Sequence, residues 1–443
     1  SAFASALAIL FMFWSITILV KKLILQDEKL TKSKGIAILG SGLVGSLAFT
    51  FTDSFWFNAV EAEVYAMATC ILAVLFYLGL LWERDMHKPR GNKWLVLIAF
   101  IVGLSFGVHF MGLLSIPAIG LLYYFKNYKE ITIKNFIIAN VTVVAILLFI
   151  FKLLLPSTLK LFGWFEVMFV NTFGLPFNSG TIFLGLVIIA LFYFLLKNTR
   201  KKDYPLLNTI ILCVVFIFIG FSCWIMLPIR ANAGTVINEN NPNNARELLA
   251  YYNLEQYPET HLFYGPQFTE IYGQLDPDNP YEDDKPIYEK NEETGKYEII
   301  NDWKNAKQNI DDAHKSILPR MWSTEHIANY MEYTGPIKFT IKAEYQNEDE
   351  LLNAVTQFRR EYATGKLDNE DYDRFLREFG EYLNVEKPSF WDNVYYLFDY
   401  QMGYMYWRYF MWNFVGRQDD VQGQGSDLHG NWLSGIPLVD QAR

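Results

Sequence analysis

Long apolar runs separated by short charged segments fill the chain up to about residue 227, and this pattern constrains the fold most. Runs of about 18 to 20 mostly apolar residues are long enough to cross the hydrocarbon core of a bilayer. Beyond residue 227 the sequence is polar, acidic and rich in aromatic residues. The pattern predicts a mainly α-helical, polytopic membrane protein. We expect a transmembrane domain at residues 1–227 and a large, mostly helical soluble domain at residues 228–443.

Lysine and arginine orient this predicted membrane domain, because short positively charged loops are retained on the cytoplasmic side. The basic segments are "KKLILQDEKLTKSK", "WERDMHKPRGNK", "KNYKEITIKN" and "KNTRKK". By contrast, "TDSFWFNAVEAE" has no basic residue, and the predicted outer loop from Leu153 to Gly180 has only Lys160. The chain then enters from outside at residue 1 and crosses near residues 36–50, 63–82, 135–152, 181–197 and 206–227. Residues 94–125 must cross twice, with a turn near Gly107 to Gly112, which gives about eight crossings and an outer soluble domain.

Three carboxylates, Asp53, Glu61 and Glu63, lie in the outer segment "DSFWFNAVEAEVYAM" without a basic neighbour in sequence. Asn58 and Glu61 fit a helix capping box, which would explain Glu61 without any function. Glu63 lies about 200° round such a helix from Glu61, so the two glutamates cannot share one face. Neither helix capping nor the helix dipole favours a carboxylate at the position of Glu63, and it is therefore the stronger catalytic candidate. Asp53 ends a predicted span and is either solvated or catalytic.

Other polar residues are expected at the same outer face, where ionisable groups at membrane depth indicate a functional site. His109 is either a satisfied histidine in a tight turn or a ligand-binding residue. Arg230 suits a lipid phosphate or pyrophosphate, although arginine at a helix end also reaches ordinary head groups. Asn238, Glu239 and Asn240 follow in "INENNPNN", a run that by itself predicts a loop.

The segment "FWDNVYYLFDYQMGYMYWRYFMWNF", residues 390–414, is dense in aromatic residues at helical spacing. One predicted stripe comprises Tyr395, Phe398, Met402, Met405 and Tyr409. A buried core face is the commoner explanation of such a stripe. A helix lying on the outer leaflet and a sugar-binding platform are the alternatives.

Several classes of function are excluded by the motifs that the sequence lacks. It has no Gly-rich phosphate loop, Rossmann fingerprint, nucleophile elbow, zinc spacing or basic face for nucleic acid. All three cysteines lie in apolar runs, which excludes a disulfide framework and a cysteine zinc site in the soluble part. The soluble part has no Asn-x-Ser/Thr acceptor, which favours a bacterial protein. An enzyme of this kind would take its activated substrate from the membrane.

Several long motifs resemble, in this order, those of a bacteroidete family of multi-spanning proteins related to the eukaryotic transmembrane protein O-mannosyltransferases. They are "TDSFWFNAVEAEVYAM", "GLSFGVHFMGLLSIPAI", "LPIRANAGTVINENNP", "YYNLEQY", "LPRMWS" and "YMYWRYFMWNFVGRQDD". The family is assigned to the GT-C glycosyltransferase superfamily. The resemblance implies transfer of a sugar, expected to be mannose, from a polyprenyl-phosphate carrier to Ser/Thr of exported proteins. The expected location is the bacterial inner membrane, with the soluble domain in the periplasm and no nucleic-acid partner.

In GT-C enzymes the catalytic carboxylate usually lies in the first outer loop, and the family's "FWDxGEF"-like segment does not occur in this chain. We therefore expect the first span and that loop to be missing. On the positions present, the resemblance points to Asp53, Glu61 and Glu63 as a second acidic cluster, to Arg230 for the carrier phosphate and to His109 beside the transfer site. Cationic groups or a divalent cation, Mg²⁺ or Mn²⁺, would stabilise the departing phosphate. Two alternatives stay open: a transferase acting on a lipid-linked glycan, and a non-catalytic membrane scaffold that binds an envelope partner.

Overall fold

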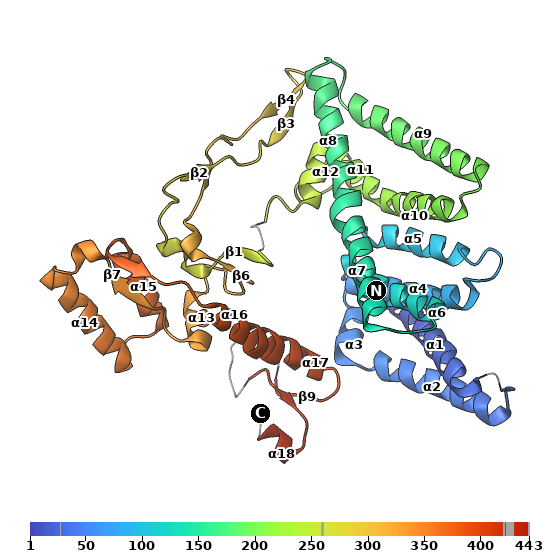
Figure 1. Ribbon diagram of the computed structural model, residues 1–443, viewed down its shortest axis with the longest axis horizontal. Coiled ribbons are helices and arrows are strands. Elements are labelled where there is room, and N and C mark those ends of the chain that lie inside the picture. Colours follow the sequence, from blue (N-terminus) through green and yellow to red (C-terminus); the bar gives the residue numbers. More distant parts are fainter. Residues whose placement is uncertain (27, 258–260, 420, 422–428, 442–443) are drawn as a thin grey trace. The chain divides into compact units, whose positions relative to one another are not determined.

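The computed structural model describes residues 1–26, 28–257, 261–419, 421 and 429–441. It is mainly helical, and six described helices are long and apolar enough to cross a membrane, which confirms the predicted class of a polytopic helical membrane protein. The chain forms two compact units (Figure 1). Unit 1 comprises Ser1–Tyr257 with Lys290–Glu298, and unit 2 comprises Pro258–Glu289 with Ile299–Arg443. The units therefore divide at Tyr257, beyond the hydropathy boundary near residue 228.

Unit 1 is built from apolar helices joined by short turns. Its helices are α1 (Ala2–Leu25), α2 (Lys32–Thr50), α3 (Asp53–Val60), α4 (Tyr65–Asp85), α5 (Lys93–Ser105), α6 (Ser115–Asn127), α7 (Ile133–Leu148), α8 (Leu155–Asn171), α9 (Ser179–Lys201), α10 (Pro205–Phe221), α11 (Met226–Asn232) and α12 (Ala245–Tyr252). Short segments of other helix types join some of them: η1 (Phe110–Leu114), η2 (Phe149–Leu154) and η3 (Ser222–Ile225). The hairpin of β3 (Tyr288–Asn291) and β4 (Lys296–Ile299) supplies the last part of this unit.

The core of unit 1 lies between α4, α5 and α10, and glycine lets two of these helices touch backbone to backbone. A Cβ added to Gly103 would lie 2.1 Å from the carbonyl oxygen of Ile217, and one added to Gly220 would lie 2.2 Å from that of Phe100. Small residues at a helix crossing allow this close approach in membrane proteins. The crossing of α5 and α10 therefore holds the centre of unit 1 together.

The two ends of α4 differ in charge. At its last turn, Glu83 is 7 % exposed and pairs with Lys22 of α1 at 2.8 Å and with Lys126 of α6 at 3.2 Å. The turns that join α1 to α2, α4 to α5 and α9 to α10 lie at one end of these helices, and α3 lies at the other (Figure 1). The basic loops and the acidic segment thus lie at opposite ends of α4; which side of the membrane each end occupies stays a prediction.

Residues 94–125 break into α5 and α6, separated by the turn at residues 106–109 and the 3₁₀ segment η1. That each of these helices crosses the bilayer, as the eight-crossing path requires, stays a prediction. The predicted outer loop from Leu153 to Gly180 is itself helical up to Asn171, and its place on the outer side stays a prediction. Pro156 lacks the amide that would bond back to Lys152, and the π-helical turn η2 accommodates this defect without ending the helix. In Figure 1, α8 stands at a steep angle to α9 and α10.

A buried carboxylate, Glu166, fixes the end of α8. It is fully buried, and it accepts hydrogen bonds from the backbone amides of Asn178 (2.5 Å) and Thr181 (2.9 Å). The hydroxyl of Thr181 and the phenol of Tyr297, in β4, also donate to it, at 2.8 and 3.4 Å. Asn171 adds two hydrogen bonds to the backbone of Tyr297. The α8–α9 turn and the β3–β4 hairpin are therefore held by one side-chain network.

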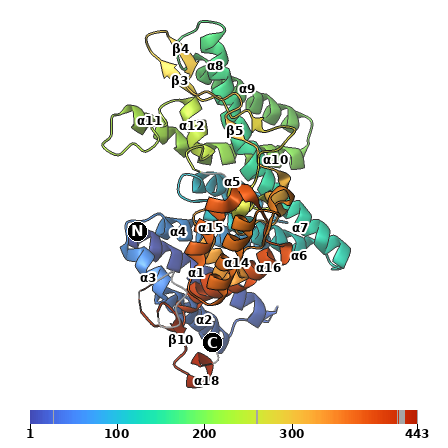
Figure 2. The same ribbon diagram turned by 90° about the vertical axis from the view of Figure 1, so that its left-hand side faces the viewer.

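Unit 2 combines short strand pairs with helices around a second core. Its helices are α13 (Ile327–Thr334), α14 (Asp349–Ala363), α15 (Asn369–Phe379), α16 (Phe390–Tyr396), α17 (Arg408–Met411) and α18 (Pro437–Asp440), with the π-helical segment η8 (Leu397–Trp407) and the 3₁₀ segments η4 (Phe268–Tyr272), η5 (Asp312–His314), η6 (Ala343–Tyr345) and η7 (Gly380–Tyr382). The antiparallel strand pairs are β1 (Tyr264–Pro266) with β6 (Lys315–Ile317), β2 (Tyr281–Glu282) with β5 (Lys307–Gln308), β7 (Phe339–Ile341) with β8 (Leu383–Val385), and β9 (Gly416–Arg417) with β10 (Trp432–Leu433). Its core gathers the inner faces of α13, α14 and α15 against β7 and β8, and Figure 2 shows α14, α15 and α16 together from a second side.

We expect Glu166→Ala to loosen the α8–α9 turn, because two buried amides would lose their acceptor at a cost of about 1–3 kcal/mol each. Hydrogen exchange of residues 172–182 should become faster, and the midpoint of thermal unfolding should fall. Glu130→Ala, at an exposed position in a loop, is the matched control and should change neither. Unchanged exchange in Glu166→Ala would show that the network does not hold the turn.

His314 predicts a pH dependence of unit 2. Burial lowers the pKa of its imidazole below the usual value, and its Nδ1 lies 3.1 Å from the hydroxyl of Thr269. The unfolded chain then binds the proton more readily, so this histidine stabilises the fold above its unfolded pKa of about 6.5, and the contribution is lost as the pH falls. His314→Gln should flatten the fall in unfolding temperature between about pH 7.5 and pH 5.5. His326→Gln, at an exposed histidine, should leave that slope unchanged.

Candidate functional site

The predicted catalytic residues Glu61 and Glu63 lie in a short link between α3 and α4. Residues Glu61–Val64, which we call the acidic link, are all exposed. The predicted capping box is wrong, because Asn58 lies inside α3 and Glu61 is the residue that ends this helix, with extended backbone angles. The C-terminus is the negative end of the helix dipole and repels a carboxylate. Extending α3 through Glu61 and Glu63 would place both glutamates in its last turn, where this repulsion disfavours helix. The two glutamates therefore lie in a link, and the helical angle between them does not apply.

Asp53 has a local structural role. It is the first residue of α3, directly after the N-cap position at Thr52, and it is half-buried. The positive end of the helix dipole stabilises a carboxylate there by roughly 0.3–1 kcal/mol. Asp53 begins a separate helix rather than ending a span, since α2 ends at Thr50. This place at the helix start explains Asp53 structurally, and its catalytic role stays a prediction.

The structure places His109 against the start of α4, the helix that follows the acidic link. Its ring nitrogen Nδ1 accepts a hydrogen bond of 3.1 Å from the backbone amide of Met111, so His109 caps the segment η1. The imidazole ring also lies 5.6 Å, between ring centroids, from that of Tyr65, the first residue of α4. Tyr65 is two residues beyond Glu63. His109 therefore lies beside the first residue of α4, which directly follows the acidic link in sequence.

The turn that carries His109 also holds the start of the segment that leads to Arg230. The indole nitrogen of Trp224 donates a 2.8 Å hydrogen bond to the carbonyl of Phe106, and a Cβ added to Gly107 would meet the sulfur of Cys223. Arg230 follows in α11, and its side chain is exposed. Within the described part of the chain, its guanidinium has no hydrogen bond or ion pair with any of the three predicted acids. Arg230 is therefore available to a ligand, and its role in binding the carrier phosphate stays a prediction.

The predicted residues Asn238, Glu239 and Asn240 lie in a stretch without helix or strand, as expected for a loop. The side-chain amide of Asn238 donates to the carbonyl of Ala231 at 3.3 Å and to the side chain of Asn241 at 2.8 Å, which ties the loop back to α11. Asn240 has left-handed backbone angles, and both Asn240 and Glu239 are exposed. This loop lies directly after α11 and not at the acidic link.

A divalent cation was one expected means of stabilising the leaving phosphate. Among the described residues, no group of three or more histidine, cysteine, aspartate or glutamate side chains is placed to hold a metal ion. The acidic link and His109 alone therefore do not supply a ligand set, and no step of the chemistry below is assigned to a metal.

The sequence analysis missed the two buried carboxylates, Glu83 and Glu166. Both are structural: Glu83 pairs with two lysines and Glu166 accepts four hydrogen bonds. For Glu166 the available signal was a single glutamate inside an apolar run, whereas Glu83 lies in the charged segment "WERDMHKPRGNK" and gave no such signal. That signal would not have distinguished a structural carboxylate from a catalytic one, because that depends on partners distant in sequence.

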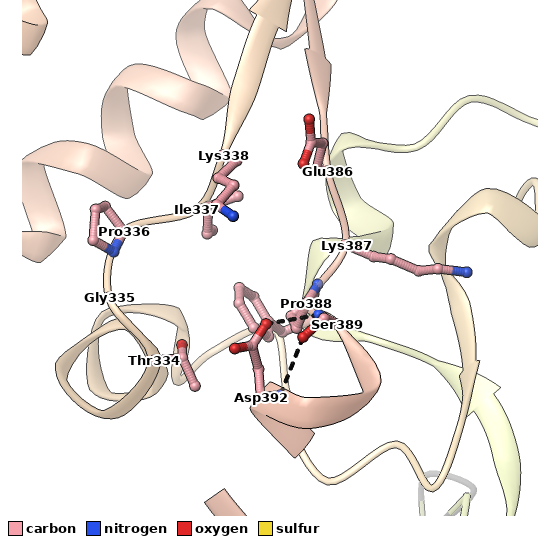
Figure 3. A pocket seen from close by; sticks show the side chains of 11 residues that line it. Thr334, Gly335, Pro336, Ile337, Lys338, Glu386, Lys387, Pro388, Ser389 and Asp392 are labelled. Atoms are coloured by element: carbon pink, nitrogen blue, oxygen red, sulfur yellow. Dashed lines mark hydrogen bonds between the residues drawn. The ribbon is translucent and has the colours of Figure 1, made fainter. Parts of the chain in front are cut away.

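A pocket of about 210 Å³ lies in unit 2, where the segment that enters β7 and the segment that leaves β8 diverge (Figure 3). Its charged lining comprises Lys338, Lys387, Glu386 and Asp392. Asp392 and Ser389 form a reciprocal capping box at the start of α16, drawn as dashed lines in Figure 3. None of the predicted site residues lines this pocket, so it is a separate feature of the soluble unit.

Comparison with known families gives two matches. Residues 1–132 match the model of the protein O-mannosyl-transferase TMEM260 N-terminal domain, and residues 258–398 match a family of unknown function, DUF8416. No curated protein and no solved structure matches the chain. The first match covers Asp53, the acidic link and His109. It relates the N-terminal part of this chain to the protein O-mannosyltransferases.

Proposed function

We propose that this protein is a membrane glycosyltransferase of the GT-C type that moves mannose from a polyprenyl-phosphate carrier to Ser/Thr hydroxyls of exported proteins. The observation that carries the proposal is the match of residues 1–132 to a protein O-mannosyltransferase domain, because the matched region contains the acidic link and His109. In this proposal the link faces the outer side of a bacterial inner membrane, and the soluble part lies in the periplasm. Six apolar helices agree with a donor that is itself a membrane lipid.

The transfer needs a base and a site for the leaving group. A new bond forms between the acceptor hydroxyl oxygen and the anomeric carbon of mannose, while the bond from that carbon to the carrier phosphate oxygen breaks. The hydroxyl proton passes to a carboxylate, and the polyprenyl phosphate leaves with the bonding electron pair. We assign Glu63, with Glu61 beside it, as a carboxylate of the second acidic cluster that receives this proton together with the acids of the first outer loop that the resemblance implies. Both side chains are exposed in the link and so are accessible to an acceptor.

We assign Arg230 to the carrier phosphate. A guanidinium binds a phosphate with two parallel hydrogen bonds, and it stabilises the charge that grows on the leaving oxygen. Arg230 is exposed on α11, which begins after a segment that packs on the turn of His109. The loop with Asn238, Glu239 and Asn240 follows α11 and would contribute polar contacts to the carrier or sugar.

Glu63→Gln should reduce mannose transfer in cells by at least about a hundredfold, the usual lower range for loss of a general base. Arg230→Ala should also reduce transfer, and Arg230→Lys should restore only part of it, because a lysine keeps the charge but not the bidentate geometry. Glycan staining of exported proteins, normalised to the amount of transferase in the membrane, measures the effect.

The controls are Glu130→Gln and Lys129→Ala, two exposed residues in the loop before α7. They should leave glycosylation unchanged. Normal glycosylation in both Glu63→Gln and Arg230→Ala would remove these site assignments. A loss seen in the lipid-linked glycans but not in the proteins would favour the alternative transferase, and no change in either fraction, even when the gene is deleted, would favour a scaffold.

The two roles open to His109 can be separated by substitution. Asparagine can accept a hydrogen bond at a cap position as the imidazole does, whereas alanine cannot. If His109 binds the substrate, His109→Asn and His109→Ala should both reduce transfer, as this proposal expects. If His109 only caps η1, His109→Asn should retain transfer and His109→Ala should lose thermal stability, by about 0.5–2 kcal/mol.

A further inference from the structure

The helical run from Phe390 to Met411 in unit 2, formed by α16, η8 and α17, has two different faces. Its inner face carries a row of residues spaced by four: Tyr396, Tyr400, Tyr404, Arg408 and Trp412. The rings of Tyr396 and Tyr400 stack at 4.9 Å, and both contact Tyr333 of α13. The guanidinium of Arg408 lies 4.0 Å from the ring centroid of Tyr404 and is 2 % exposed. Packing within unit 2 therefore accounts for this face.

The outer face carries a second aromatic row, which we call the outer row. It comprises Trp391, Tyr395, Phe398, Met402, Tyr406, Phe410 and Phe414. Every one of these side chains is exposed, and Trp391 is 73 % and Phe398 61 % exposed. Of the predicted stripe, Tyr395, Phe398, Met402 and Tyr409 are exposed. The expectation that the stripe forms a buried core face is therefore wrong.

The mixture of helix types keeps the outer row in line. In an α-helix, four residues make slightly more than one full turn, so a side chain at i+4 is rotated past the one at i. In a π-helical turn, which holds more residues, four residues make slightly less than one full turn. The drifts oppose each other, so one row persists from α16 to α17. Rings of neighbouring members meet at 6.2 Å (Tyr406 and Phe410) and 5.1 Å (Phe410 and Phe414). Ring contacts therefore join the last three members of the row, and the other members follow at intervals of three or four residues.

The chemistry of the outer row fits the interface of a bilayer. Tryptophan and tyrosine concentrate at the level of the lipid head groups, where an apolar ring body meets a polar tip. The charged residues between Phe390 and Phe414 are Asp392, Asp399 and Arg408, and none of them belongs to the row. A sugar-binding platform would instead need polar partners beside its rings, and the row itself offers only the hydroxyls of its tyrosines and the indole of Trp391. Contiguous exposed apolar patches of this kind mark interaction surfaces.

The chain itself keeps the membrane within reach of the outer row. It passes between unit 1, which holds the spans, and unit 2 three times, after Tyr257, after Glu289 and after Glu298. A tethered surface binds as an intramolecular event, so even a weak intrinsic affinity gives stable docking. We propose that the outer row lies in the head-group region of the same bilayer that the helices of unit 1 cross, with the helical run parallel to the membrane plane. The proposal concerns docking alone and does not depend on the proposed transfer reaction.

The test uses an environment-sensitive fluorophore on a single cysteine in the full chain, reconstituted in phosphatidylcholine vesicles. Cys70, Cys213 and Cys223 are replaced by alanine, and Met402→Cys carries the label. The control is Thr356→Cys, at an exposed position on α14. A lipid with a nitroxide near its head group should quench the label at 402 several-fold more than the label at 356. The difference should persist at high salt, because the row carries no charge.

Two results would overturn the proposal. Quenching at 402 by water-soluble iodide, but not by the nitroxide lipid, would show that the outer row faces water. Protection from both quenchers would show that protein covers it, either another part of this chain or a second copy. Phe398→Cys and Tyr406→Cys repeat the measurement at two further positions of the row, so the test does not rest on one variant. Because no sugar transfer is measured, failure here would leave the proposed function untouched.

Discussion

The close crossing of α5 and α10 determines where the candidate site can form. Gly103 and Gly220 let the two backbones touch, and the crossing fixes the turn at which α5 ends. That turn presents His109 to Tyr65 at the start of α4 and receives Trp224 from the segment after α10. The turn after α5 therefore contacts both the start of α4, through His109, and the segment that precedes α11, through Phe106. The site is thus positioned by small residues inside the helical unit, while the groups assigned to chemistry are exposed at one end of it.

The buried carboxylates Glu83 and Glu166 each have charged or hydrogen-bonding partners. Glu83 and its two lysines join α1, α4 and α6 at the basic end of α4, and Glu166 joins α8, the turn before α9 and the β3–β4 hairpin. Removing one partner of such a group leaves the rest buried and unsatisfied, which is the costly case. Glu61 and Glu63 have no such partners among the described residues. Their exposed position without a structural partner is what distinguishes them from the two buried glutamates, and it is the reason that we propose Glu63 for the chemistry.

The sequence predicted the class of the protein well and its local geometry only in part. Hydropathy indicated the apolar helices, and basic loops placed the acidic segment at the opposite end of α4 from Glu83. It did not indicate that α3 ends at Glu61, because an asparagine followed three residues later by a glutamate is typical of a helix start, whereas Asn58 lies inside α3. The helix through Pro156 was missed because a proline normally ends a helix, whereas a π-helical turn absorbs it here. The aromatic stripe at residues 390–414 has the period of a core helix on both faces, so periodicity alone could not tell the packed row from the exposed one.

The family match over residues 1–132 indicates a membrane glycosyltransferase related to the protein O-mannosyltransferases, and a lipid carrier as the sugar donor is our proposal. The most direct test is to supply the purified full chain, in vesicles, with polyprenyl-phosphate mannose labelled in the sugar and with an exported protein as acceptor. The account predicts that label moves into the protein, bound to Ser/Thr side chains, and that polyprenyl phosphate is released in equal amount. Label that stays on the carrier with active vesicles and intact acceptor would contradict the account.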